Sequence, residues 1–222
     1  MIRELSKYSL IFPDPSIYTS KEGILCFGGD LSANRVMAAY VKGIFPWYNE
    51  DDPILWWCPD PRFVLKIDDL HISKTLKKTI KKNIFEIKFD TAFVQVMIEC
   101  ANAPREGQDG TWIHPDMIET YSELFKQGFA HSFEAWMDGK LVGGGYGIIV
   151  GDIFCGESMF TKKNDASKVA FVHLVERLKK NGFTLIDSQI HTNHIESLGA
   201  KHITRDLYLQ KVKEALCKPK DF

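Results

Sequence analysis

The sequence lacks the features that define several large classes of protein. Its five cysteines are odd in number, far apart and without a C-x-x-C pair, so we expect neither a disulfide framework nor a zinc site. No apolar run approaches the ~18 residues of a membrane-spanning helix, and the N-terminus lacks the apolar stretch of a signal peptide. These absences predict a soluble, cytoplasmic protein that binds no metal and has no contact with a membrane.

An excess of charge of one sign is also missing. The 28 basic and 29 acidic residues leave a net charge of −1, so any binding of nucleic acid needs a local basic face. The chain has 222 residues, 45% hydrophobic and 26% charged, which suits one large domain or a small domain attached to a main one. Because residues 1–62 are dense in proline, glycine and aromatics, we predict a small N-terminal domain there and a main domain over 63–222.

The hydrophobic pattern from residue 83 onward predicts strand, helix, helix, strand, strand, strand, helix, strand. Residues 130–137 form one strand, Asp138-Gly139 is a hairpin turn, and residues 141–189 give a second hairpin, a crossover helix and a returning strand. Residues 210–217 indicate a short last helix. An antiparallel meander followed by a right-handed crossover is typical of an α+β or α/β fold of the GNAT type, an acetyltransferase-like mixed sheet with flanking helices.

Polar side chains gather at the end of the returning strand. Asp187 and Gln189 are two residues apart, so on a strand both point to the same face. A carboxylate beside an amide could orient or deprotonate an amine and stabilise an oxyanion. Glu157, on the neighbouring strand, adds a second carboxylate that would suit a cationic substrate. On spacing alone, the simpler interpretation is that Asp187 caps the turn that follows the strand.

The sequence offers no convincing covalent nucleophile or metal site. It has no G-x-S-x-G, and His191 and His194 stand on a segment that is not helical, so we expect both to be surface or hydrogen-bonded residues. The turn at residues 161–167, before the crossover helix, contains no glycine to cradle the pyrophosphate of coenzyme A. Direct transfer from another acyl donor remains, such as an aminoacyl ester on RNA, with no cofactor.

One short segment is strongly basic. Ser73 is expected to cap a helix whose apolar stripe is formed by Ile72, Leu76 and Ile80. A solvated face is the simpler interpretation of the remaining helix surface, and a strip that binds phosphates is the functional one. The lysines of this strip are Lys74, Lys77, Lys78, Lys81 and Lys82.

Three tryptophans fall close together near the predicted domain boundary. For Trp56 and Trp57 we expect a place in a small satellite core of the N-terminal domain. Trp47 follows a proline in a turn-like setting, so it is the better candidate to present a ring to a ligand.

Short motifs run along most of the chain in a fixed order. They are G-G-D-L-S at 28–32, G-I-F-P-W at 43–47, I-L-W-W at 54–57, P-D-P-R at 59–62, G-T-W-I at 110–113, G-E-S-M-F at 156–160, A-S-K at 166–168, L-I-D followed by Gln at 185–189, and S-L-G-A at 197–200. Through these motifs the chain resembles the leucyl/phenylalanyl-tRNA–protein transferase family from about residue 12 to about residue 209. The resemblance implies transfer of Leu, Phe or, less readily, Met from aminoacyl-tRNA to the α-amino group of proteins that begin with Arg or Lys. Such proteins are then degraded under the bacterial N-degron rule. A monomeric enzyme is expected.

The resemblance also implies roles for individual residues. Asp187 and Gln189 match the family's catalytic pair, and the residue between them, Ser188, stands where the family more often has Cys; we expect its side chain to point away from the site. The aminoacyl-adenosine site is implied at Tyr40, Trp47, Trp112, Tyr121, Glu157 and Met159. An apolar pocket for the transferred side chain is implied at Phe154, Ser167, Phe171 and Ile186.

Two questions of function stay open at the level of sequence. Asp187, held by Gln189, could act as a general base, or it could only position the amine while the hydroxyl group of the tRNA moves the proton. The chain could also be a transferase that adds amino acids to a cell-wall precursor, or a non-catalytic RNA-binding module in which Asp187 is structural.

Overall fold

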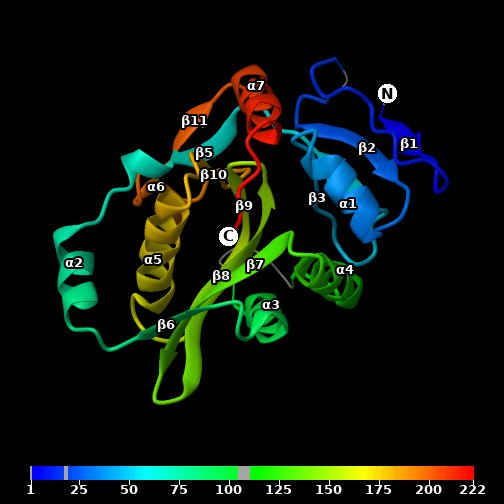
Figure 1. Cartoon of the computed structure of the whole chain (residues 1–222). Helices are drawn as coiled ribbons and strands as arrows, with labels where there is room; N and C mark the ends of the chain where they lie inside the picture. The colour runs from blue at the N-terminus through cyan, green and yellow to red at the C-terminus, as the bar shows by residue number, and fades with distance from the viewer. Residues whose placement is uncertain (1, 18–19, 105–110) are drawn as a thin grey trace.

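The computed structural model describes residues 2–17, 20–104 and 111–222 and contains two β-sheets with helices packed around them (Figure 1). Gly110 of the G-T-W-I motif lies outside the described residues. No helix in these three ranges is long and apolar enough to cross a membrane.

The larger sheet has seven strands in the order β11-β5-β10-β9-β8-β7-β6. Strands β6 to β9 form an antiparallel meander, and β10 returns parallel to β9 after helix α5, which confirms the predicted order and the mixed sheet. In chain order the strands are β5 (Arg62–Lys66), β6 (Glu86–Phe89), β7 (Ala130–Met137), β8 (Lys140–Val150), β9 (Ile153–Thr161), β10 (Leu185–Asp187) and β11 (Lys201–Ile203).

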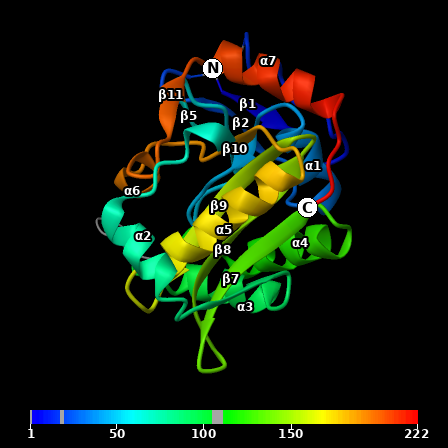
Figure 2. The same cartoon turned by 60° about the vertical axis from the view of Figure 1, so that its left-hand side comes forward.

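Helices cover both faces of this sheet (Figures 1 and 2). Helix α5 packs on one face against Phe133 and Phe154, whereas α3 and α4 pack on the other against Tyr146. The helices are α1 (Ala33–Tyr40), the 3₁₀ turn η1 (Ile67–Asp69), α2 (Lys74–Lys81), α3 (Phe93–Ala101), α4 (Pro115–Lys126), α5 (Ala166–Lys180), α6 (Asn193–Glu196) and α7 (Arg205–Leu216).

The smaller sheet belongs to the N-terminal part of the chain and has the order β1-β2-β4-β3. Its strands are β1 (Arg3–Leu5), β2 (Ile24–Gly28), β3 (Phe45–Pro46) and β4 (Leu55–Trp57). Trp56 is fully buried and meets Phe12 edge-on at 4.9 Å, as expected for a core tryptophan. The expected separate core is wrong, however, because Trp56 belongs to a cluster that continues into α3 and α4. The division of the chain after residue 62 stays a prediction.

The glycine-rich strand β8 lets α5 and an aromatic ring approach the sheet closely. Gly143 and Gly147 lie on the face that α5 covers. A Cβ atom at Gly143 would stand 2.7 Å from Cβ of Ala166 and 2.8 Å from the amide nitrogen of Ser167. A Cβ atom at Gly147 would stand 2.6 Å from the ring of Phe154. These glycines therefore set where the first turn of α5 and the ring of Phe154 can lie.

We predict that Gly143→Ala destabilises the protein, because the new methyl group overlaps the first turn of α5. The free energy of unfolding in urea should fall by roughly 1–3 kcal/mol, the usual range for overpacking. The control is Gly156→Ala in the adjacent strand β9, where the nearest atoms would be 3.8 Å from the new carbon. Equal stabilities for the two variants would contradict the packing argument.

Candidate functional site

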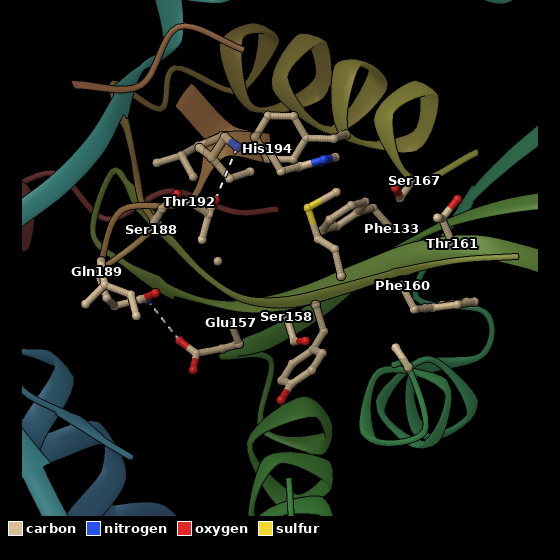
Figure 3. A pocket seen from close by; sticks show the side chains of 18 of the residues that line it. Phe133, Glu157, Ser158, Phe160, Thr161, Ser167, Ser188, Gln189, Thr192 and His194 are labelled. Carbon is tan, nitrogen blue, oxygen red and sulfur yellow. Dashed lines mark hydrogen bonds between the residues drawn. The ribbon is translucent and has the colours of Figure 1, made fainter. Parts of the chain in front are cut away.

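A cavity of about 640 Å³ lies between the first turns of α5, the second half of β9 and the segment that follows β10 (Figure 3). Its wall is largely apolar, and polar side chains stand at several places around it. Residues implied by the resemblance that line it are Trp47, Trp112, Phe154, Glu157, Met159, Ser167, Phe171, Ile186 and Gln189. The structure thus brings together side chains from five separate segments of the chain.

Three of the expected site residues do not line the cavity: Asp187, Tyr40 and Tyr121. All three are almost completely buried. Tyr40 and Tyr121 join their hydroxyl groups at 2.8 Å, and the hydroxyl of Tyr121 donates to Glu157 Oε2 at 3.4 Å. The two tyrosines therefore lie behind Glu157 and support it, and their expected place in the aminoacyl-adenosine site stays a prediction.

The expectation that Asp187 and Gln189 share one face of a strand is also wrong. Strand β10 ends at Asp187, and Gln189 has a left-handed backbone with φ of 55°. The main-chain N–H of Gln189 donates to Asp187 Oδ1 at 3.0 Å, while its side-chain Nε2 donates to Glu157 Oε1 at 3.3 Å. Gln189 consequently connects a buried carboxylate to a carboxylate in the cavity wall.

The same change of direction places Ser188 in the cavity wall, although we expected its side chain to point away (Figure 3). Alternation of side chains holds only along a strand, and Ser188 is already beyond its end. Its main chain is fixed by a hydrogen bond from its N–H to the carbonyl of Phe63 at 3.0 Å.

Asp187 is held by two residues for which the sequence predicted no role in the site, although Arg62 ends the P-D-P-R motif. Arg62 Nε donates to Asp187 Oδ1 at 2.8 Å, and Nη2 donates to Oδ2 at 2.6 Å. The hydroxyl of Tyr208, in α7, donates to Asp187 Oδ2 at 2.7 Å. Burial raises the pKa of Tyr208 well above its ordinary value, so this hydroxyl keeps the proton that it donates. The guanidinium group also lies 4.9 Å from the ring of Phe45, which lines the cavity.

Of the two carboxylates that contact Gln189, Glu157 is the one that faces the cavity. Burial raises its pKa to about 8; the hydrogen bond with Tyr40 works in the opposite direction, and the charge of Asp187 adds to the rise. Burial also raises the pKa of Tyr40 and Tyr121 well above ordinary values, so both hydroxyls stay protonated. Since Glu157 is only partly exposed and its neighbours are neutral tyrosines and an amide, it can exchange a proton near neutral pH.

The two histidines of this region differ in their surroundings. His191 is a surface residue that pairs with Glu196 at 3.2 Å, as expected. His194 instead contributes to the cavity wall, and burial and the nearby Lys168 lower its pKa, so its ring is neutral. The spacing of the two histidines did not predict this position. It depends on the short helix α6, which contains His194 in a segment that we expected not to be helical. Within the described ranges, no three His, Cys, Asp or Glu side chains are arranged to hold a metal ion.

The basic strip, defined by Lys74, Lys77, Lys78, Lys81 and Lys82, lies on the exposed surface of α2 and just beyond its end. Ser73 Oγ accepts from the N–H of Leu76 at 3.2 Å, which confirms the expected N-cap. Thr79 Oγ1 donates to Asp165 Oδ2 at 2.9 Å, and Asp165 lines the cavity at the start of α5. The helix that carries the strip therefore docks beside the cavity.

Comparison with known proteins gives matches over most of the chain. The family described as leucyl/phenylalanyl-tRNA protein transferase matches residues 64–213, and the N-terminal domain of that family matches residues 29–60. The chain is 50% identical over 212 residues to a leucyl/phenylalanyl-tRNA–protein transferase of Sulfurimonas denitrificans, covering 96% of this chain and 92% of the relative. A relative of the same name from Syntrophobacter fumaroxidans is 52% identical over 205 residues, covering 92% and 87% respectively.

Among solved structures, the chain is similar to a GCN5-related N-acetyltransferase from Kribbella flavida. The TM-score is 0.40 and the sequence identity 10%, covering 74% of this chain and 58% of the other.

The mixed sheet, the cavity and the sequence matches together define the class of this protein, which is an enzyme of the aminoacyltransferase type. The matches also settle the membership that the ordered motifs indicated. The chain belongs to the leucyl/phenylalanyl-tRNA–protein transferase family.

The Arg62–Asp187 pair gives a prediction about stability. Arg62→Leu leaves a buried carboxylate without its cation, and we expect the free energy of unfolding to fall by roughly 3–5 kcal/mol. The double variant Arg62→Leu with Asp187→Leu removes both charges and should recover a large part of this loss. Denaturant titration of wild type and the three variants, including Asp187→Leu, measures the coupling. Additive losses would contradict a direct pair.

Glu157 gives a prediction about pH. Its pKa is about 8 in the folded protein against an ordinary 4.5, so folding favours the protonated form. The stability that it contributes is fully present below about pH 4.5 and is lost as pH rises to about 8. Glu157→Gln cannot ionise and should not show this loss. The difference in free energy of unfolding between the variant and the wild type should therefore grow from pH 5 to pH 8.5, and a constant difference would contradict the assignment.

Proposed function

We propose that this chain transfers Leu, Phe and, less readily, Met from aminoacyl-tRNA to the α-amino group of proteins that begin with Arg or Lys. The observation that carries the proposal is an apolar cavity with a proton-exchanging carboxylate, Glu157, and an amide, Gln189, in its wall. Membership of the family supports the donor and acceptor classes. The product would carry a destabilising N-terminus, and the enzyme would act in the cytoplasm as a monomer.

The apolar part of the cavity suits the transferred side chain. Phe154, Phe171 and Ile186 contribute to its wall, so it can accept Leu or Phe by burying them. Unbranched Met fits with some loss, while polar side chains leave unpaired groups and β-branched ones fit poorly. Trp47 and Trp112, also in the wall, can stack on the terminal adenine, and such stacking contributes ~1–3 kcal/mol per base.

Glu157 is the group that we assign to the acceptor. A carboxylate at the edge of an apolar cavity attracts an ammonium group, and a bound cation favours its ionised form. Its pKa of about 8 lies close to the ordinary 7.7–8.0 of an α-amine, so little free energy is needed to move the proton between them.

The reaction needs no covalent enzyme intermediate. The nitrogen lone pair of the acceptor attacks the ester carbonyl, the new C–N bond forms, the ester C–O bond breaks, and the amine proton ends on the ribose oxygen that leaves. Gln189 can donate an amide hydrogen within the cavity, and Asp187, which does not line it, holds Gln189 through the main-chain N–H. We therefore propose that Asp187 and Gln189 act as one unit. Asp187 positions Gln189, and the side chain of Gln189 contacts the substrate.

The deciding experiment mixes purified protein, radiolabelled Phe-tRNA and a peptide that starts with Arg or Lys. Label in the peptide supports the proposal, and the same peptide with an acetylated N-terminus serves as the control. Label in a cell-wall precursor instead would identify a different transferase. Binding of tRNA without any transfer would identify an RNA-binding module.

Substitutions at the proposed pair separate positioning from general-base catalysis. Asp187→Asn keeps an oxygen that can accept from the N–H of Gln189, so we expect turnover at saturating substrates to fall by less than about 100-fold. General bases contribute about 10²–10⁴-fold. Gln189→Ala removes the side chain in the cavity and should cost more. If Asp187→Asn lost more activity than Gln189→Ala with intact folding, Asp187 would be the base.

Substitutions in the basic strip test its role in binding tRNA. Alanine at Lys74, Lys77 and Lys81 should weaken binding and flatten its salt dependence, because each lost phosphate contact reduces the slope of log K against log salt by roughly 0.9. The matched control replaces the exposed lysines Lys21, Lys213 and Lys218. Equal slopes for both triple variants, measured by filter binding, would remove the strip from the proposal.

A further inference from the structure

The side chain of Phe154 is one of the aromatic groups in the wall of the apolar cavity. This side chain is fully buried within the protein and contributes to the cavity wall. On one side the ring lies against Gly147 of β8, where a Cβ atom would overlap it. The backbone of β8 therefore prevents the ring from moving in that direction.

A second aromatic ring stands behind Phe154. The rings of Phe154 and Phe222 are stacked, with centroids 6.0 Å apart and planes at 27°. Phe154 lines the cavity and Phe222 does not, so Phe222 can affect a bound side chain only through residues such as Phe154. The chain reaches this place because the segment after α7 returns across the molecule and ends beside the C-terminal part of α5 (Figure 2).

Several contacts fix Phe222 in this place. Arg177 Nη2 donates to the main-chain oxygen of Phe222 at 3.0 Å, and its guanidinium carbon lies 4.8 Å from the ring centroid. His131 stacks on the ring with centroids 4.1 Å apart and planes at 16°. The imidazole of His131 is itself held by Asp90 at 2.9 Å. These contacts hold the ring of Phe222 in a fixed position.

We propose that Phe222 is a positioning residue for substrate specificity: it holds Phe154 in place in the cavity wall and so limits the size of the transferred side chain. The proposal rests on the proposed function, since it takes the apolar cavity as the site of that side chain. A side chain larger than Phe then needs Phe154 to move. The backbone at Gly147 and the ring of Phe222 both restrict the movement of the Phe154 ring, so the supported wall excludes the indole of Trp.

The test compares transfer rates for one tRNA body charged with Leu, Phe or Trp, with a peptide beginning with Lys as acceptor. In Phe222→Ala the ratio of kcat/KM for Trp to that for Phe should rise about tenfold, the lower end of what one hydrophobic pocket contact contributes. Phe222→Trp places a larger ring against Phe154 and pushes Phe154 into the cavity. The ratio of kcat/KM for Phe to that for Leu should therefore fall. Phe222→Leu provides an intermediate case if the alanine variant fails to fold.

The matched control is Phe129→Ala, which removes a partly exposed aromatic ring that is not part of the cavity wall. A loss of overall stability would change all rates together and leave the ratios unchanged. Unaltered ratios in folded Phe222→Ala and Phe222→Trp would overturn the proposal. If the wild type transferred none of the three amino acids, the proposed function would fail instead, and binding of non-hydrolysable phenylalanyl- and tryptophanyl-adenosine would still test the wall.

Discussion

The buried pair of Arg62 and Asp187 is the interaction on which the geometry of the site depends. It joins β5 to the end of β10, and Tyr208 adds α7 to the same cluster. Removing two charges from water is costly, and such a pair is stable only when its hydrogen bonds are well aligned. Asp187 meets this requirement with bonds from a guanidinium group, a hydroxyl and the main-chain N–H of Gln189. The last of these bonds fixes the change of chain direction that places Ser188 and Gln189 in the cavity wall.

The close packing beside the cavity depends on the opposite kind of constraint, which is the absence of side chains. Gly143 and Gly147 let α5 and Phe154 lie closer to β8 than any other residue would permit. The aromatic rings that this leaves free to pack, Phe133, Phe154 and Phe171, form a continuous series of edge contacts beneath α5. An apolar enclosure of this kind also explains the raised pKa of Glu157, because its charged form is poorly solvated there.

The sequence predicted what depends on local pattern. The order of elements from residue 83, the strand at residues 130–137 and the N-cap at Ser73 follow from periodicity and capping chemistry, and the structure confirms them. The roles of Arg62 and Tyr208 could not be predicted in this way. Arg62 is far from Asp187 along the chain, and Tyr208 belongs to a helix that the sequence predicted only from residue 210 onward. The left-handed backbone of Gln189 had no local signal either, because glutamine has no special preference for it. That single residue accounts for the wrong face assigned to Gln189 and for the misplaced Ser188.

The two carboxylates of the site illustrate how environment divides roles between chemically similar groups. Asp187 is fully buried and forms an ion pair with Arg62. The arginine balances its charge, and the carboxylate oxygens already accept hydrogen bonds. Among the residues that the structure describes, Glu157 is hydrogen-bonded to a tyrosine hydroxyl and an amide and forms no ion pair, and it faces the cavity. A group that already has a cation serves best as a fixed point, whereas a group that lacks one gains most from binding a substrate ammonium. Gln189 contacts both carboxylates. Binding of an amine at Glu157 would therefore also affect the segment that Asp187 holds in place.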